Sequence, residues 1–284
     1  MPSITIHIFH TGSVCVAPAL PFGGEHCGPL KAAGVLGRRR DRLWLPVSAY
    51  LIDCPQGRVL FDCGWHRDMS PRGVLDRRAQ LRSLGSLPLP LTNQGILPPG
   101  QAVEEQLAAL GLRPRDLDRV LLSHLDCDHA NGLRSVAEAK ALLVSPEELR
   151  FAENGSLMNR IRYAPQWWRG TKLRPFAWNG TEGPADRSYD VFGDGSLVLV
   201  NIPGHSPGLC ALRVTGTDGR FVLLAADGGY ARRSWEEGVL SGIADDRPAQ
   251  KASLAWLREQ SRDPRCLAVL ANHDPDVRPG TLVL

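Results

Sequence analysis

The stretch RVLLSHLDCDH, residues 119–129, is the most informative part of this sequence. It begins as a short apolar run of strand composition and ends in a dense group of polar side chains: His124, Asp126, Asp128 and His129. Alternate residues of an extended backbone share a side, so His124, Asp126 and Asp128 are predicted to face one cavity, with His129 turning in where the chain bends. Four such side chains gathered in a pocket would repel one another or lose solvation unless a cation held them.

Three further apolar runs end in the same kinds of residue. They are SLVLVNIPGH (196–205), FVLLAAD (221–227) and CLAVLANHD (266–274), which place His205, Asp227 and His273 at or near strand ends. Functional groups of α/β proteins gather where strands end and loops converge. A polar loop with incidental histidines would explain one such group, but it explains the whole set poorly, so we favour a metal site.

Strand and helix patterns interleave along the chain, which predicts an α/β fold in one domain, residues 1–284. A strand is expected at Ile4–Phe9, an irregular segment at Gly12–Arg42, and a hairpin turn at Pro55-Gln56-Gly57. Expected helices cover residues 72–82, 102–110, a segment beginning at Ser145-Pro146, and part of 245–260. In the third of these, Ser145 is the expected N-cap, with Glu148 as its capping-box partner. The run CLAVLANHD is predicted to be the final strand.

The composition is that of an ordinary globular protein, with 284 residues, 43% hydrophobic residues and a net charge of +3. That charge is too small to indicate a nucleic-acid partner, and the basic run Arg38-Arg39-Arg40 is expected to be a solvated loop. Neither a membrane span nor a signal peptide is expected. Seven cysteines without a CxxC pair favour a reducing, cytoplasmic location without disulfides. The oligomeric state stays open, with a homodimer considered.

The polar motifs resemble those of a known family. HLDCDH is similar to the H-x-H-x-D-H signature of the metallo-β-lactamase superfamily, and the remaining motifs are colinear with its N-acyl homoserine lactone lactonases. LPVSAYLIDCPQGRVLFDCG (45–64) looks like their opening strand pair, which ends here in Asp62-Cys63-Gly64. IPGHSPG, DGGY and NHD look like their later motifs, so the resemblance covers roughly Leu45–Asp274. It implies an αβ/βα four-layer sandwich, in which two mixed β-sheets are flanked by helices.

Carried over residue by residue, the resemblance implies two divalent metal ions. One would be held by His124, Asp126, His205 and a bridging Asp227, and the other by Asp128, His129, His273 and the same Asp227. Zn²⁺ suits these ligands best, and Fe²⁺ or Mn²⁺ would also be accepted. Two such ions can share a hydroxide that opens a lactone or related ester. Asp128 would then relay a proton, and Tyr230 would donate to the carbonyl oxygen or else simply pack beside the loop.

Asp126 departs from the family pattern, which has a second histidine at this position. Three carboxylates against two dications leave a formal charge of +1, where two carboxylates leave +2, so water activation should be weaker. Three alternatives stay open: an iron-dependent redox relative, a weakly active metal-binding homologue because of Asp126, and a phosphotriester or aryl-ester hydrolase, since such hydrolases share much of the motif pattern. His26 is expected at the surface or in the core, and Trp167, Trp168 and Trp178 are expected in the core. A place in the substrate pocket is the alternative for all four.

Overall fold

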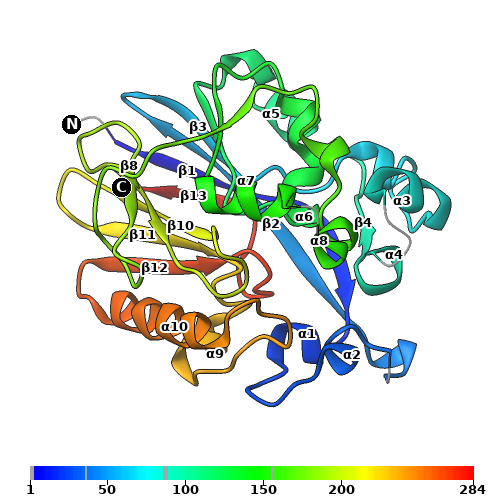
Figure 1. The fold of residues 1–284 in the computed structure, drawn as a ribbon. Coiled ribbons are helices and arrows are strands. Elements are labelled where there is room, and N and C mark those ends of the chain that lie inside the picture. Colours follow the sequence, from blue (N-terminus) through cyan, green and yellow to red (C-terminus); the bar gives the residue numbers. More distant parts are fainter. Residues whose placement is uncertain (1–2, 36, 86–88, 155) are drawn as a thin grey trace.

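The computed structural model describes residues 3–35, 37–85, 89–154 and 156–284. Within them, two β-sheets pack face to face, with helices on the outer side of each (Figure 1). The first sheet has the order β13-β1-β2-β3-β5-β6-β7, with β4 also paired to β1, and the second has the order β12-β11-β10-β9-β8. Parallel pairs (β3 with β5, β11 with β12) and antiparallel pairs (β1 with β2, β9 with β10) occur together. The predicted sandwich of two mixed sheets is confirmed.

The elements have the following bounds. The strands of the first sheet are β1 (Thr5–Val16), β2 (Leu43–Cys54), β3 (Gly57–Phe61), β4 (Gln94–Ile96), β5 (Arg119–Leu121), β6 (Leu142–Val144), β7 (Leu173–Pro175) and β13 (Gly280–Val283). Those of the second are β8 (Ser188–Asp190), β9 (Leu197–Asn201), β10 (Cys210–Thr215), β11 (Phe221–Ala226) and β12 (Cys266–Ala271). The helices are α1 (Ala19–Phe22), α2 (Pro29–Ala32), α3 (Arg77–Leu84), α4 (Leu89–Thr92), α5 (Val103–Ala109), α6 (Cys127–Ala130), α7 (Pro146–Glu153), α8 (Leu157–Arg162), α9 (Arg232–Glu236) and α10 (Arg247–Arg262).

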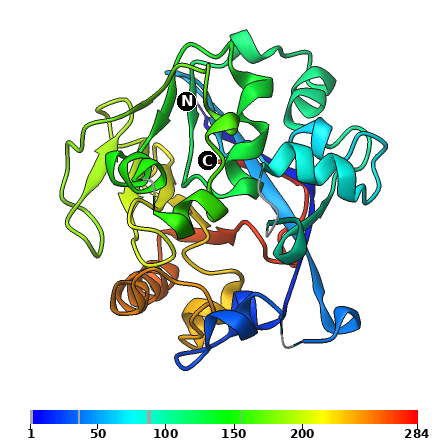
Figure 2. The same ribbon diagram turned by 45° about the vertical axis from the view of Figure 1, so that its right-hand side comes forward.

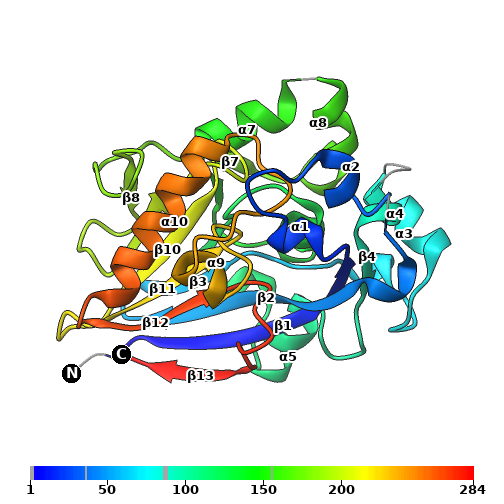
Figure 3. The same ribbon diagram turned by 90° about the horizontal axis from the view of Figure 1, so that it is seen from below.

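Side-chain alternation in the strands of the first sheet divides the core in two. In β2 and β3, Tyr50, Ile52 and Phe61 point between the sheets, where they pack with residues of β9 to β11. Leu51 and Leu60 point to the opposite face and pack with residues of α3 and α5. Successive side chains of a strand leave on opposite sides, so a strand that is apolar throughout must be covered on both faces. Figure 3 shows the result, with α10 and α5 on the two outer sides of the sandwich.

The N-terminal region differs from the prediction. The strand does not end at Phe9 but continues to Val16, because β1 pairs with β2 over its whole length, with an irregularity between His10 and Ser13. Gly12 lies within this irregularity at φ +88°, a conformation open to glycine and strained for other residues. The expected irregular segment also contains α1 and α2. Figure 2 shows these two helices beside the chain that links α9 to α10, and Gly242 donates a hydrogen bond to the carbonyl of Leu20.

Most of the other expected elements exist with small shifts. The hairpin turn forms, with Cys54 paired to Gly57, and helices α3, α5, α7 and α10 lie in the expected segments. Ser145 caps α7 as predicted, by accepting a hydrogen bond from the backbone N–H of Glu148. The predicted last strand, β12, is followed by β13, which pairs with β1 at the edge of the first sheet. No helix in the described ranges is both long and apolar enough to cross a membrane.

Candidate metal centre

The predicted ligands lie just beyond strand ends at one edge of the sandwich. His124 follows β5, His205 follows β9, Asp227 follows β11 directly, and His273 follows β12. Strands β9, β11 and β12 run in the same direction, because β10 is antiparallel to both β9 and β11 while β12 is parallel to β11. Their carboxyl ends therefore meet at a common edge, to which β5 brings His124 from the other sheet.

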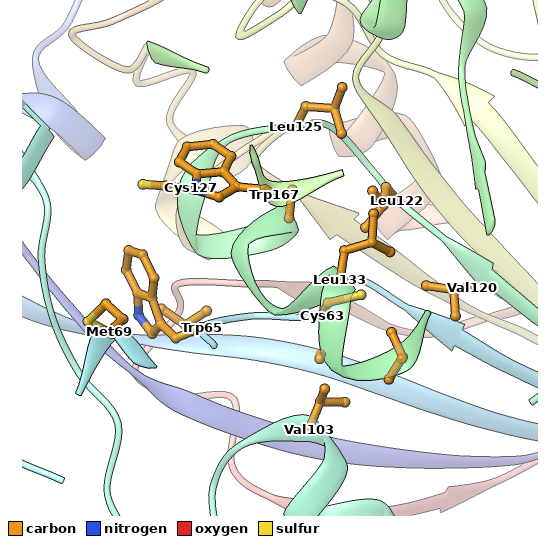
Figure 4. Packing of buried hydrophobic residues seen from close by; sticks show 14 of the residues in the cluster. Cys63, Trp65, Met69, Val103, Val120, Leu122, Leu125, Cys127, Leu133 and Trp167 are labelled. Carbon is orange, nitrogen blue, oxygen red and sulfur yellow. The ribbon is translucent and has the colours of Figure 1, made fainter. Parts of the chain in front are cut away.

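The segment that carries four of these residues is partly helical. Asp126 is still extended, but α6 begins at Cys127, so Asp128 and His129 lie on its first turn. The prediction that Asp128 reaches the site by strand alternation is therefore wrong, because a helical turn brings it there. Cys127 points away from the site, as expected, and packs in the core cluster that also contains Trp167 (Figure 4).

The seven side chains form three overlapping groups whose ligand atoms lie within 4.8 Å of one another: His124 with Asp126 and His205, Asp128 with His129 and His273, and His124 with His129 and Asp227. The Nε2 atoms of His129 and His273 lie 3.1 and 3.2 Å from Oδ1 of Asp227. Nε2 of His205 lies 2.8 Å from Oδ2 of Asp126 and 3.8 Å from Oδ2 of Asp227. Asp227 thus lies between the first two groups.

Within the described residues, the group of His124, His129 and Asp227 contributes three buried polar atoms that have no hydrogen-bond partner: Nε2 of His124, Nε2 of His129 and Oδ1 of Asp227. Nδ1 of His205 is a fourth such atom in the cluster. An unpartnered buried polar atom costs about 1–3 kcal/mol, so three of them at one point need a compensating ligand. Imidazole nitrogens and carboxylate oxygens in this arrangement are the donors that zinc and similar ions prefer. The residues present fit a metal.

Groups outside the cluster orient its histidines. Nδ1 of His129 donates to Asp62 at 2.8 Å, and Nδ1 of His273 donates to the carbonyl of Pro46 at 2.8 Å. A histidine whose Nδ1–H is bound in this way presents the lone pair of Nε2 to a metal. Asp62 itself sits at φ +62° directly after β3. Asp62 belongs to one of the sequence motifs, but the sequence predicted no separate role for it.

The electrostatics of the cluster favour a cation. Burial would raise the pKa of the Asp227 carboxyl, but His273 and His129 hold that pKa well below its usual range. Burial would lower the pKa of His129, yet the carboxylates of Asp227 and Asp62 raise it well above the usual value. The pKa of His273 is raised in the same sense, against burial, chiefly by Asp227. The Asp227 carboxylate thus stays ionised and attracts positive charge, which protons or metal ions can supply.

Comparison with known proteins places the chain in a family. The model of the metallo-β-lactamase superfamily matches residues 42–271. The chain belongs to the metallo-β-lactamase superfamily. A probable metallo-hydrolase of Mycobacterium bovis is 31% identical over 266 residues, which cover 89% of this chain and 76% of that protein. The N-acyl homoserine lactonase AttM of Rhizobium radiobacter is 28% identical over 239 residues, covering 82% and 83%.

The fold agrees with solved structures of the superfamily. An N-acyl homoserine lactone hydrolase, solved with N-hexanoyl-L-homoserine at its catalytic metal centre, has a TM-score of 0.72 to this chain at 20% identity. The match covers 96% of this chain and 94% of that one. With this fold and these relatives, the chain is a hydrolase, as the sequence predicted.

At the position where the superfamily signature has a histidine, Asp126 is paired with an arginine that sequence reasoning missed. Nε and Nη2 of Arg162 donate to the two carboxylate oxygens of Asp126 at 2.6 and 2.9 Å. Burial would raise the pKa of the Asp126 carboxyl, but Arg162, assisted by His124 and His205, holds it well below the usual range. Arg162 lies 36 residues after Asp126, at the end of α8, so no local sequence pattern connects the two residues.

A second residue with a role that was not predicted is Glu148, which is fully buried on α7. Its carboxylate accepts hydrogen bonds from the backbone N–H of Leu125 at 2.9 Å, from the Ser206 hydroxyl at 2.6 Å and from the Tyr163 hydroxyl at 3.4 Å. In the predicted capping box, this carboxylate would accept a hydrogen bond from the backbone N–H of Ser145. The three donors from elsewhere in the fold bind it instead. Glu148 therefore joins α7 to the two loops that carry His124 and His205.

The remaining candidate residues are Tyr230, His26 and three tryptophans, and they lie in different surroundings. Tyr230 is at the site: its ring stacks on His273 with centroids 5.3 Å apart and meets His205 edge-on at 6.1 Å. His26 is exposed in the segment before α2. Trp167 is fully buried and donates its indole N–H to the carbonyl of Ser83, so it belongs to the core rather than to a substrate surface. The expectation that the other tryptophans pack in the core holds for Trp168, and Trp178 is half-buried.

Proposed function

We propose that the chain is a metal-dependent lactone hydrolase that acts on N-acyl homoserine lactones or closely related esters. The observation that carries the proposal is the convergence of seven ligand-type side chains, one group of which holds three buried atoms that lack partners among the described residues. The choice of a lactone is supported by the curated relatives, several of which are N-acyl homoserine lactonases.

The proposed ligands fall into two groups. His124, Asp126 and His205 would hold one ion, Asp128, His129 and His273 would hold the other, and Asp227 would serve both, with zinc as the expected metal. When bound, the ions would supply Lewis acidity, which polarises a carbonyl and lowers the pKa of water.

Two residues of the chain are proposed to handle protons. Asp128 is a buried carboxylate at the site, 3.5 Å from Nε2 of His273, where it can accept a proton from water and pass it on. Burial and the neighbouring carboxylates raise the pKa of the Tyr230 hydroxyl well above its usual value, so it stays protonated. A protonated hydroxyl can donate a hydrogen bond to the oxygen on which negative charge develops.

Side-chain nucleophiles are poorly placed to compete with water. Burial raises the pKa of the Cys63, Cys127 and Cys210 thiols well above the usual value, so little reactive thiolate forms. The hydroxyls of Ser123 and Ser206 are buried and donate to Asp62 and Glu148. Water activated at the metal site is therefore the proposed nucleophile.

The test combines metal analysis with a hydrolysis screen. We expect the zinc-loaded chain to open lactone rings in a pH-indicator assay, and a chelator to abolish the activity. Asp227→Asn should lose metal and activity together, because both groups share this ligand, whereas the exposed control Asp218→Asn should keep both. A thiol alkylating reagent should have no effect.

Two results would overturn parts of the proposal. If the chain never exceeds trace metal content after exposure to Zn²⁺, Mn²⁺ or Fe²⁺, the metal centre itself is wrong. If the loaded chain hydrolyses phosphotriesters or aryl esters and no lactone, the metal chemistry stands and the substrate class is wrong.

A further inference from the structure

Arg162 sits at the atoms that would bind one of the two ions. Its Nη2 donates to Oδ2 of Asp126 at 2.9 Å and lies 3.0 Å from Nε2 of His205. Both acceptor residues belong to the group formed by His124, Asp126 and His205. A dication and this N–H therefore compete for the same lone pairs.

The guanidinium is fixed in this place from several directions. Nη1 donates to Oδ2 of Asp245 at 2.7 Å and to the carbonyl of His205 at 3.2 Å, while Nε donates to Oδ1 of Asp126. The side chain also lies 5.1 Å from the centroid of the Tyr163 ring and is only 14% exposed. An arginine with its planar donors satisfied on both sides is costly to displace.

The group of Asp128, His129 and His273 has no comparable arginine among the described residues. Within the described parts of the chain, neither arginine nor lysine forms an ion pair with Asp128 or Asp227. Histidines are the positively chargeable groups that face these two carboxylates, and a dication can replace their protons. The two groups thus differ in charge although their ligand types are similar.

We propose that Arg162 is a built-in cation that neutralises Asp126 and makes the His124–Asp126–His205 group the weaker of the two metal positions. The inference rests on the proposed metal centre and goes beyond it, because it ranks the two positions. The pair of Asp126 (−1) and Arg162 (+1) sums to zero, so the group offers a dication about the charge that a neutral histidine would. The extra negative charge inferred from the sequence is thereby cancelled, and the nearby guanidinium repels the incoming ion.

Zinc titration of the metal-free chain tests this ranking, by isothermal calorimetry with elemental analysis of dialysed samples. We expect wild type to bind one equivalent tightly and a second at least tenfold more weakly. Arg162→Gln removes the charge and keeps a polar side chain, so it should tighten the second equivalent by tenfold or more, about 1.4 kcal/mol. Asp126→Asn combined with Arg162→Gln should lose the second equivalent, which assigns it to this group.

Two further variants separate charge from folding. Arg162→Lys keeps the cation and loses the planar donors, so it should tighten the second equivalent less than Arg162→Gln does. Arg160→Gln alters an exposed arginine of the same helix and should have no effect, and circular dichroism verifies that each variant is folded.

Equal tight binding of both equivalents by wild type would overturn the proposal. So would an unchanged or weaker second equivalent in Arg162→Gln, or a tightening in Arg162→Lys as large as that in Arg162→Gln. Absence of zinc binding in every variant would instead overturn the metal centre, and the ranking with it.

Discussion

Asp62 shows how a single side chain can organise the candidate metal centre. Its carboxylate accepts four hydrogen bonds, from the backbone N–H and hydroxyl of Ser123, from Nδ1 of His129 and from the amide of Asn272. Ser123 and Asn272 each precede a proposed ligand in the chain, so one buried acid fixes residues next to His124 and His273 as well as His129 itself. Such supporting groups set the orientation and basicity of metal ligands.

Substitution of Asp62 tests this role. In Asp62→Asn, the amide has one carbonyl oxygen for several donors, so His129 loses its fixed tautomer. We expect zinc affinity, measured by competition with a coloured chelator, to fall by about 10- to 100-fold. Asp53→Asn changes an acid on β2 that pairs with Arg58 near the surface and serves as the control. Unchanged zinc affinity in a folded Asp62→Asn would show that Asp62 does not orient the ligand.

Among the helices, α7 supports the loops of the candidate metal centre. Its N-cap Ser145 also donates to the carbonyl of Gly208, and a Cβ on Gly208 would lie 2.2 Å from the backbone nitrogen of Glu148. The helix start and the loop after β9 are therefore in direct backbone contact. This close approach lets Glu148 reach the loops that carry His124 and His205.

The link predicts the effect of Glu148→Gln. The amide nitrogen cannot accept the hydrogen bonds that the carboxylate accepts from Leu125 and Ser206, so a buried donor loses its partner. We expect the free energy of unfolding, from urea denaturation, to fall by about 1–3 kcal/mol. Zinc affinity should fall as well, since both loops lose their support. Glu153→Gln, on the exposed side of the same helix, should change neither quantity. A variant as stable as wild type would contradict the role of Glu148 as a structural link.

At the scale of the whole molecule, the candidate centre joins the two sheets. His124 and the α6 residues extend from the first sheet, whereas His205, Asp227 and His273 extend from the second. A metal held by both would bind the folded chain and not the unfolded one, so it would stabilise the sandwich as a unit.

This arrangement predicts how stability depends on pH. Without metal, the stabilisation from Asp227 and Asp126 is complete above about pH 4 and is lost as the pH falls through their lowered pKa values. The stabilisation from protonated His129 and His273 is complete below about pH 6.5 and is lost as the pH rises through their raised pKa values. The metal-free chain should therefore be most stable between about pH 4 and 6.5.

Zinc should change this profile. It needs deprotonated imidazoles, so the rise in Tm on adding zinc should grow from pH 5.5 to pH 8. Differential scanning calorimetry with and without chelator measures it, and His273→Gln should reduce the rise. A zinc effect that is independent of pH, or largest in acid, would contradict the assignment of His129 and His273 as ligands.

The residue types of the site and the strands that lead to them can be predicted from the sequence. Ligand-type residues stand at or just beyond the ends of apolar runs, and this pattern depends on local periodicity, which a sequence displays directly. The sandwich of two mixed sheets followed from the resemblance carried by the same motifs. The helical turn at Asp128 escaped prediction, because alternation assumes an extended chain and α6 begins one residue earlier.

Which other groups contact these residues depends on the tertiary structure. Arg162 reaches Asp126 across 36 positions, and Asp62 reaches His129 across 67. Glu148 has the right spacing for a capping box, but its carboxylate instead accepts hydrogen bonds from Leu125, Ser206 and Tyr163. A local pattern states which hydrogen bonds a side chain can make, whereas packing decides which donors are near enough to make them. The charge of the Asp126 position therefore became known only once the fold had brought Arg162 beside it.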